Sequence, residues 1–207
     1  MSKVIRAIAV GLVLSIAISF FSFSGKCDRI REQVLRLHVM ANSDSQEDQA
    51  LKLKVRDAVI EAAAGMVDTA ANEADAEQCV RERLPEIVQA AQQCVWDEGY
   101  DYNINAELCE MYFATRRYEA EPAVTLPAGV YNALRVTIGT AGGKNWWCVV
   151  FPPMCVSAAT DAAALDDVLD DGQRDIVTSE GKYEVRFKVV EVFSGISNKF
   201  SEWFGKD

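Results

Sequence analysis

The sequence predicts an α+β fold: a single domain in which helices pack on an antiparallel β-meander, preceded by an N-terminal hydrophobic segment. Three observations support this class. Several stretches alternate apolar and polar residues with the period of a strand, and others repeat apolar residues at helical spacing. These stretches follow the order strand, helices, a run of strands, helix, strand and helix, so helices and strands are segregated rather than strictly alternating.

The predicted elements have recognisable boundaries. Ser45 with Asp48 resembles a capping box, and Pro85 kinks the second helical region or starts a new helix there. The strands predicted from alternation run over residues 35–40, 100–112, 133–138, 145–151 and 183–187. The helices predicted from apolar spacing run over residues 46–66, 74–97, 161–171 and, as an amphipathic C-terminal helix, 190–207.

The first 25 residues have the layout of a signal peptide or an N-terminal membrane anchor. Lys3 and Arg6 form a basic head, and the nineteen residues Ala7–Gly25 carry no charge. Small residues flank Phe23, which favours cleavage after Ser24. The uncharged run is also long enough for a spanning helix, which needs roughly 18 residues, so an uncleaved anchor over 7–25 is the alternative.

The rest of the chain is strongly acidic and has the size of one domain, which we place at 27–195. The whole chain has 21 Lys and Arg against 31 Asp and Glu, and its net charge of −10 becomes −13 without the three basic residues Lys3, Arg6 and Lys26. Such a domain repels nucleic acid and anionic lipid head groups. We therefore expect a protein partner and no nucleic acid.

Six cysteines occur, which is an even number and permits disulfides in an exported protein. They are Cys27, Cys79, Cys94, Cys109, Cys148 and Cys155. The favoured pair is Cys148 with Cys155, because a short strand and turn can bring them together. The alternative is that all six are small buried thiols.

The sequence offers little support for a catalytic or metal site. His38 is the only histidine, whereas catalytic zinc sites usually draw on two or three. The motifs H-E-x-x-H, C-x-x-C and G-x-S-x-G are absent, and the glycine-rich turn 139–144 lacks the spacing of a phosphate loop. We therefore predict no metal, no cofactor and no catalytic residue, and a structural hydrogen bond for His38.

Two adjacent tryptophans mark the strand 145–151. Alternation along a strand sends Trp146 and Trp147 to opposite faces, so they do not share a one-sided core. We predict that one is in the core and that the other is a contact residue, since partly exposed tryptophan is frequent at binding hot spots. Packing beneath the C-terminal helix is the alternative.

Three segments together resemble the stage II sporulation protein R family. They are Leu35–Val59, which includes His38-Val-Met-Ala-Asn42-Ser-Asp44; Leu126–Arg135 with the following Ile138-Gly139; and Gly143–Cys155, which includes Asn145-Trp-Trp-Cys-Val-Val-Phe-Pro-Pro153. The resemblance spans about residues 30 to 155 in the same order, together with the leader, and the first and third segments are long and unusual.

The resemblance implies signalling rather than catalysis. Members of this family are secreted from the forespore of endospore-forming bacteria into the space between its two membranes. There they trigger a membrane aspartic protease of the mother cell, which processes the precursor of the sigma-E factor. The resemblance thus implies this protease as the partner and membrane contact through the N-terminal segment, and it supplies no catalytic residues.

The polar loop after the first strand and the tryptophan strand provide the candidate contact residues, because such groups are costly to retain without a use. They are His38, Asn42, Ser43, Asp44, Asn145, Trp146 and Trp147. Two other hypotheses stay open. One is an exported hydrolase of the intermembrane space or cell wall that uses His38 or Cys148, and the other is a purely structural protein of that space.

Overall fold

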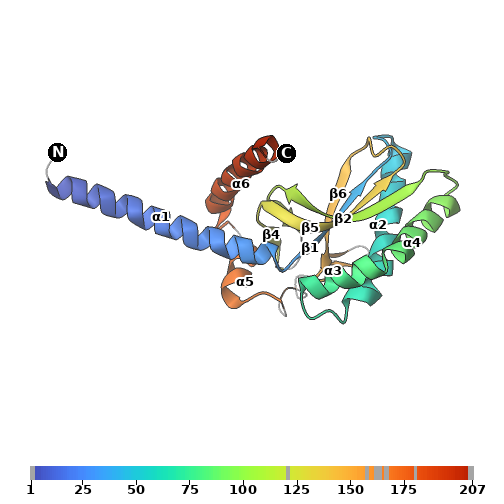
Figure 1. Cartoon of the computed structure of the whole chain (residues 1–207), viewed down its shortest axis with the longest axis horizontal. Coiled ribbons are helices and arrows are strands. Elements are labelled where there is room, and N and C mark those ends of the chain that lie inside the picture. Colours follow the sequence, from blue (N-terminus) through green and yellow to red (C-terminus); the bar gives the residue numbers. More distant parts are fainter. Residues whose placement is uncertain are drawn as a thin grey trace.

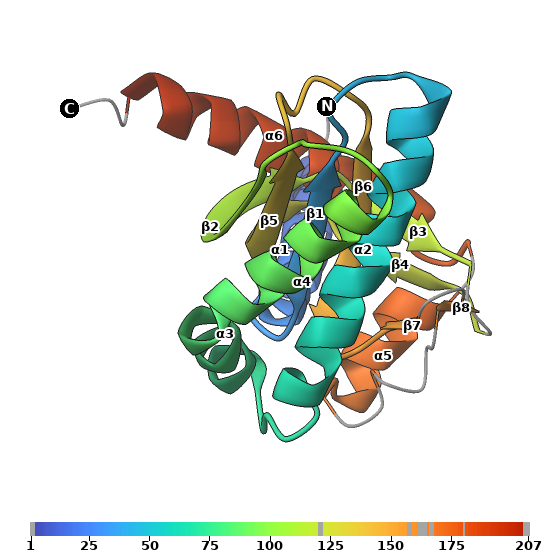
Figure 2. The same ribbon diagram turned by 90° about the vertical axis from the view of Figure 1, so that its right-hand side faces the viewer.

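The computed structural model has an α+β fold in which a mixed four-stranded sheet carries helices on both faces (Figures 1 and 2). This confirms the predicted class. The structure describes residues 3–119, 122–156, 159–160, 165, 168–179 and 181–204. Two hydrophobic clusters, one on each face of the sheet, form the core.

The N-terminal segment is one long helix, α1 (Lys3–Arg31), which projects from the rest of the molecule (Figure 1). It is long and apolar enough to cross a membrane, with a mean hydropathy of 2.4 over 18 residues. Most of it is exposed, but its last turns bury Phe23, Cys27 and Ile30 in the domain. The helix therefore runs without a break from the apolar segment into the folded core, through the predicted cleavage position after Ser24.

The strand order differs from the predicted meander. The sheet contains β1 (Leu35–Met40), β2 (Ile104–Phe113), β5 (Gly129–Ile138) and β6 (Asn145–Phe151) in the order β2-β5-β1-β6. β1 lies between β5 and β6, parallel to the first and antiparallel to the second. The connection 139–144 can span β1 because two strand spacings amount to only about 10 Å.

The central position of β1 follows from its composition. Its first five residues are buried, so both faces of the strand are covered and no polar face is left for solvent. Leu35, Leu37 and Val39 enter the cluster on one face, while Arg36 and His38 lie on the other. A strand that is buried on both faces is stable in the middle of a sheet, with a neighbour on each side.

Three helices cover the first face of the sheet. They are α2 (Gln46–Val67), α3 (Glu73–Glu82) and α4 (Leu84–Asp97). Ser45 caps α2, because its hydroxyl accepts a hydrogen bond from the Asp48 amide, and Pro85 stands in the first turn of α4. Both confirm the predicted boundaries, and proline starts a helix here because the first turn needs no amide donor.

The second face carries the end of α1, a small ribbon of β3 (Arg116–Tyr118) and β4 (Val124–Leu126), and two C-terminal helices. These helices are α5 (Asp171–Thr178) and α6 (Glu184–Phe204). Two short strands, β7 (Cys155–Val156) and β8 (Ala159–Thr160), pair with each other after β6.

Two predictions in the C-terminal part need correction. The strand predicted at 183–187 is wrong, because α6 begins at Glu184, earlier than the predicted start at 190. Phe187 and Val190 are one helical turn apart and both are buried, so tertiary packing overrides the local alternation. The helix predicted at 161–171 falls largely on residues outside the described ones, and α5 starts only at Asp171.

Arg36 is fully buried within the second cluster, where oxygen acceptors and aromatic rings surround its guanidinium group. Its Nε donates to the carbonyl oxygen of Cys148 at 3.1 Å, and its Nη2 donates to the hydroxyl of Tyr118 at 2.6 Å. The guanidinium carbon lies 4.3 Å from the ring centre of Phe113 and 4.9 Å from that of Tyr131. Ring faces and oxygen acceptors thus take the place of water around the charge.

The cysteines divide into two groups. Cys148 is disulfide-bonded, whereas the other four cysteines with described side chains are free thiols: Cys27, Cys79, Cys94 and Cys109. The side chain of Cys155 lies outside the described residues. The pairing of Cys148 with Cys155 therefore stays a prediction.

Candidate functional site

The predicted contact residues gather at one corner of the sheet, where β1 ends and β6 begins. In the β1–β6 register His38 is opposite Trp147, and Met40 is opposite Asn145. The loop with the remaining predicted residues follows β1 directly. The structure thus brings together all seven residues from two segments about 100 positions apart in the sequence.

The connection between β5 and β6 crosses over the loop that follows β1 and is hydrogen-bonded to it. The amide of Thr140 donates to Oδ1 of Asn42 at 3.0 Å, and the amide of Gly142 donates to the Asn42 carbonyl at 3.0 Å. The amide of Lys144 donates to Oδ1 of Asp44 at 2.7 Å. Asn42 and Asp44 therefore satisfy backbone groups of the connection, which is a structural use of residues predicted to contact a partner.

Asp48 organises the other side of this loop. It is only 4% exposed, and its Oδ2 accepts hydrogen bonds from Asn42 Nδ2 at 2.9 Å and from the Ser43 hydroxyl at 2.5 Å. Burial raises the pKa of this carboxyl, but hydrogen bonds from Ser43, Asn42 and Tyr102 together hold the pKa below its usual value. The sequence indicated Asp48 only as part of a capping box, so its role as the acceptor of the loop was missed.

His38 is a buried histidine with a structural environment. Its Nε2 is 2.8 Å from Oδ1 of Asn145, and its ring stacks on Trp147 with 4.0 Å between ring centres and 6° between planes. Burial lowers the pKa of His38, the charge of Arg135 lowers it further, and the Asn145 contact opposes both. The lowered pKa favours the neutral imidazole, and its hydrogen-bond partner among the described residues is the Asn145 amide, as in the predicted structural hydrogen bond.

The two tryptophans point to opposite faces, as alternation predicts. Trp146 packs against the first cluster, with the guanidinium carbon of Arg56 4.5 Å from its ring centre. Trp147 packs against the second cluster, edge to face with Phe113 at 5.0 Å. Both are half-buried and each packs against a hydrophobic cluster, so burial does not single out one of them as the core residue and the other as the contact residue.

Two members of the predicted set, Asp44 and Asn145, are exposed at this corner, which we call the distal corner because it lies at the end of β1 away from α1. The other five are buried or half-buried in contacts within the fold. Among the described residues, no three His, Cys, Asp or Glu side chains form a group that could hold a metal ion.

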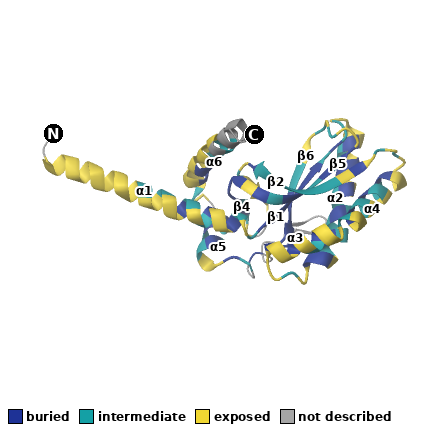
Figure 3. Ribbon diagram, viewed as in Figure 1, coloured by how far each residue is buried: buried dark blue, intermediate teal, exposed yellow. Residues whose placement is uncertain are grey.

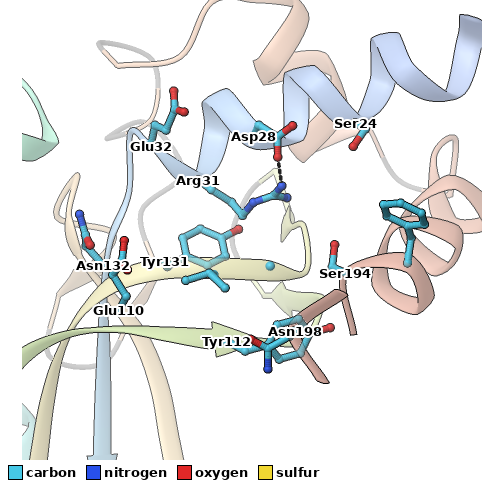
Figure 4. Close-up of a pocket in the computed structure, with 13 residues that line it drawn as sticks. Ser24, Asp28, Arg31, Glu32, Glu110, Tyr112, Tyr131, Asn132, Ser194 and Asn198 are labelled. Atoms are coloured by element: carbon cyan, nitrogen blue, oxygen red, sulfur yellow. Dashed lines mark hydrogen bonds and ion pairs between the residues drawn. The ribbon is translucent and has the colours of Figure 1, made fainter. Parts of the chain in front are cut away.

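A second surface, not predicted from the sequence, is a cleft of about 620 Å³ at the base of α1 (Figure 4). It opens between the end of α1, the neighbouring strands β2 and β5, and α6. Its charged lining consists of Asp28, Arg31, Glu32 and Glu110. We call it the basal cleft.

The charged side chains that line the basal cleft give it an excess of negative charge. Arg31 donates from Nη1 to the carbonyl oxygen of Ala128 at 2.9 Å and forms an ion pair with Asp28, so its charge is largely compensated. Glu32 and Glu110 are exposed carboxylates without such a partner among the described residues. The cleft is therefore suited to a ligand that carries positive charge and hydrogen-bond donors.

Comparison with known proteins supplies the assignment that the geometry alone does not. The model of the family described as stage II sporulation protein R matches residues 31–161. The chain belongs to this family. The matched region begins at the last residue of α1 and reaches β8, so it contains the whole sheet and α2 to α4. Membership confirms the family resemblance and supports a role in sporulation.

A relative from the family supports the same assignment. Stage II sporulation protein R of Bacillus subtilis (strain 168) is 36% identical over 141 residues, which cover 68% of this chain and 62% of that protein. The chain thus spans less than two thirds of the length of this relative. No solved structure matches the chain.

Proposed function

We propose that this member of the stage II sporulation protein R family is an exported signalling protein. It would activate a membrane aspartic protease of the mother cell and so lead to processing of the pro-sigma-E precursor. One observation carries the proposal: an apolar helix, long enough to cross a membrane, continues without a break into an acidic domain whose basal cleft opens beside it. This arrangement suits a protein that meets its partner at a membrane surface.

The activation mechanism needs no chemistry from this chain. The domain docks on the extracytoplasmic face of the protease and binds the active, dimeric state more tightly than the inactive state. A difference in affinity between two states is sufficient to shift the equilibrium toward the favoured one. The structural environment of His38 and the disulfide at Cys148 agree with such a role, since neither side chain is placed as a free catalytic group.

We place the docking surface at the basal cleft rather than at the distal corner. The cleft starts at α1 itself, whereas the corner lies a whole strand away, and five steps along β1 amount to about 17 Å. The polar side chains of the corner are mostly engaged within the fold, but Glu32 and Glu110 in the cleft are not. A basic segment of the protease just outside its membrane spans is the ligand that fits.

We further propose that α1 stays attached and holds the secreted domain at the forespore membrane, on the side of the intermembrane space. Cleavage after Ser24 would remove Phe23, whose buried ring lies 5.5 Å from that of Tyr183 and 5.6 Å from that of Phe187. Losing a buried aromatic side chain typically costs about 3 kcal/mol or more. Retention of the helix avoids this loss.

The test is co-expression of the chain with the protease and the sigma precursor in a host that does not sporulate, scored for precursor cleavage. The full chain should trigger cleavage, and a chain without residues 1–25 that remains in the cytoplasm should not. A double charge reversal, Glu32→Lys with Glu110→Lys, should abolish cleavage. Glu61→Lys, which changes an exposed carboxylate on α2, is the matched control and should leave it intact.

Several results would contradict the proposal. Failure of the exported full chain to trigger cleavage would remove the signalling function. Loss of cleavage with Asp44→Ala or Asn145→Ala, but not with the double reversal, would move the docking surface to the distal corner. Cleavage in cells that lack the protease would favour the exported hydrolase instead.

A further inference from the structure

The C-terminal helix α6 has two apolar faces, and only one of them packs on the domain. Phe187 and Val190 on the inner face are buried in the second cluster. The outer face exposes five apolar residues: Val185, Val189, Val192, Phe193 and Ile196. At about 100° per residue these five fall in one stripe roughly 100° wide. Val185 is 77% exposed and Val192 63% exposed, and contact of so much apolar surface with water is unfavourable.

Basic side chains flank the outer stripe. Arg186 and Lys188 are exposed and, by helical spacing, lie on opposite sides of it. Long cationic side chains in these positions can extend past an apolar layer and reach lipid head groups. This arrangement is typical of a helix that lies in the plane of a membrane interface.

The position of α6 relative to α1 agrees with this. Figure 2 looks roughly along the long axis that α1 follows in Figure 1, and α6 runs across that view. The two helices meet at Phe20 and Phe193, whose ring centres are 6.0 Å apart. A membrane crossed by α1 would therefore lie nearly parallel to α6.

The exposed part of α1 ends at the level where α6 crosses it. Figure 3 shows α1 exposed along its outer length and buried only at its base. Phe21 is still exposed and Phe23 is buried. The uncharged exposed stretch from Ala7 to Phe21 measures about 21 Å at 1.5 Å per residue, and the turn that carries Lys3 and Arg6 extends it to about 27 Å, near the roughly 30 Å of a bilayer core. With this stretch in the bilayer, α6 lies at the head-group level.

We infer that the outer stripe of α6 inserts into the interfacial layer of the bilayer that α1 enters, so that lipid is its partner. This goes beyond the signalling role but rests on α1 crossing the membrane, as proposed above. The domain is then held at two points and cannot rotate freely about α1. Phe193 and Ser194 also line the basal cleft, so the second contact fixes the cleft against the membrane surface.

The experiment uses the full chain in vesicles of phosphatidylethanolamine and phosphatidylglycerol. The photoreactive residue benzoylphenylalanine replaces Val192 in one variant and Val185 in another, and adducts are identified by mass spectrometry after illumination. Leu14 in α1 is the positive control for membrane insertion. Trp96 on α4, which is apolar and exposed like Val185 and Val192 but lies on another helix, is the matched negative control.

We expect lipid adducts at positions 192, 185 and 14 and none at 96. Lipid adducts at 14 but not at 192 or 185 would overturn the inference and leave the anchor role of α1 intact. Absence of lipid adducts at positions 192, 185 and 14 would overturn both the inference about α6 and the anchor role of α1. Adducts at 192 and 185 to a second copy of the chain, or to the protease when it is present, would show that protein rather than lipid covers the stripe and would also overturn it.

Discussion

The buried carboxylate of Asp48 allows a direct test of how the loop after β1 is held. Its Oδ2 accepts from both Asn42 and Ser43, and hydrogen bonds to a charged acceptor contribute about 1.5–3 kcal/mol each. The two bonds share one oxygen, so their energies do not simply add. We expect Asp48→Ala to lower the free energy of unfolding by about 3 kcal/mol, because two half-buried donors lose their acceptor and the buried carboxylate that joins them is removed.

Asp48→Asn separates charge from shape. The amide oxygen can still accept both bonds, but the negative charge and its interaction with the first turn of α2 are lost. Charged hydrogen bonds are roughly twice as strong as neutral ones, and the helix N-terminus favours an anion by about 0.3–1 kcal/mol. We expect Asp48→Asn to cost about 1–1.5 kcal/mol, less than half the effect of the alanine variant.

The measurement is urea unfolding of the full chain in mild detergent at pH 7, followed by tryptophan fluorescence. Glu61→Gln, which removes an exposed carboxylate from the same helix, is the control and should change stability by less than about 0.5 kcal/mol. Equal and small effects of Asp48→Ala and Asp48→Asn would refute the view that Asp48 anchors the loop.

The pH dependence of the stability provides an independent test, because the direction of the change follows from the shifted pKa of Asp48. The pKa of Asp48 is lowered in the folded protein from a usual value of 3.8. A carboxyl with a lowered folded pKa stabilises the fold above its unfolded pKa, and this stabilisation is lost as the pH falls through the folded pKa. The difference between wild type and Asp48→Asn should therefore be constant above about pH 5 and shrink below pH 4.

Three further predictions concern β1 and the connection between β5 and β6. Gly143→Ala should destabilise the fold by about 2 kcal/mol in urea unfolding, since a Cβ there collides with the Ser43 carbonyl oxygen; an unchanged midpoint would contradict the close approach. Arg36→Lys should cost about 3 kcal/mol in the same assay, because an ammonium cannot stack on three rings while donating to two acceptors; a loss below about 1 kcal/mol would argue against the aromatic cage. The pKa of His38 is lowered in the folded protein, so the unfolded chain binds a proton at this residue more readily. The free energy of unfolding should therefore fall as the pH drops below 6.5, by at most about 1.4 kcal/mol per pH unit. His38→Phe should remove this pH dependence, and a pH dependence that remains in the variant would belong to other groups.

Local sequence signals predicted helices and strands well wherever the element is decided by its own residues. The capped start of α2 and the break before α4 come from single side chains, Ser45 and Pro85, that satisfy or lack backbone hydrogen-bonding groups. Alternation likewise located β6 and the opposite orientation of its tryptophans. The strand predicted at 183–187 is wrong because contacts with other segments, and not its own residues alone, decide the structure there. A short alternating stretch fits both a strand and one face of a helix, and contact with α1 decides between them.

The candidate site was predicted only in part. The seven residues do lie together, but most of them hold the loop and the connection rather than face solvent. Pattern cannot distinguish a polar residue that binds a partner from one that satisfies a backbone amide 98 positions away, as Asn42 does with Thr140. No sequence pattern predicted the basal cleft. Its lining comes from α1, β2, β5 and α6, and no two of these elements follow each other directly in the sequence.

The sequence by itself determined the apolar leader, the class of fold, the acidic charge and membership of the stage II sporulation protein R family, because each depends on composition, short-range periodicity or matched strings. The tertiary structure alone decided that β1 inserts between β5 and β6, that Asp48 anchors the loop, and that α6 keeps a second apolar face turned outward beside α1. These features arise from contacts between distant segments. Such contacts depend on which surfaces remain to be buried once every helix and strand has formed.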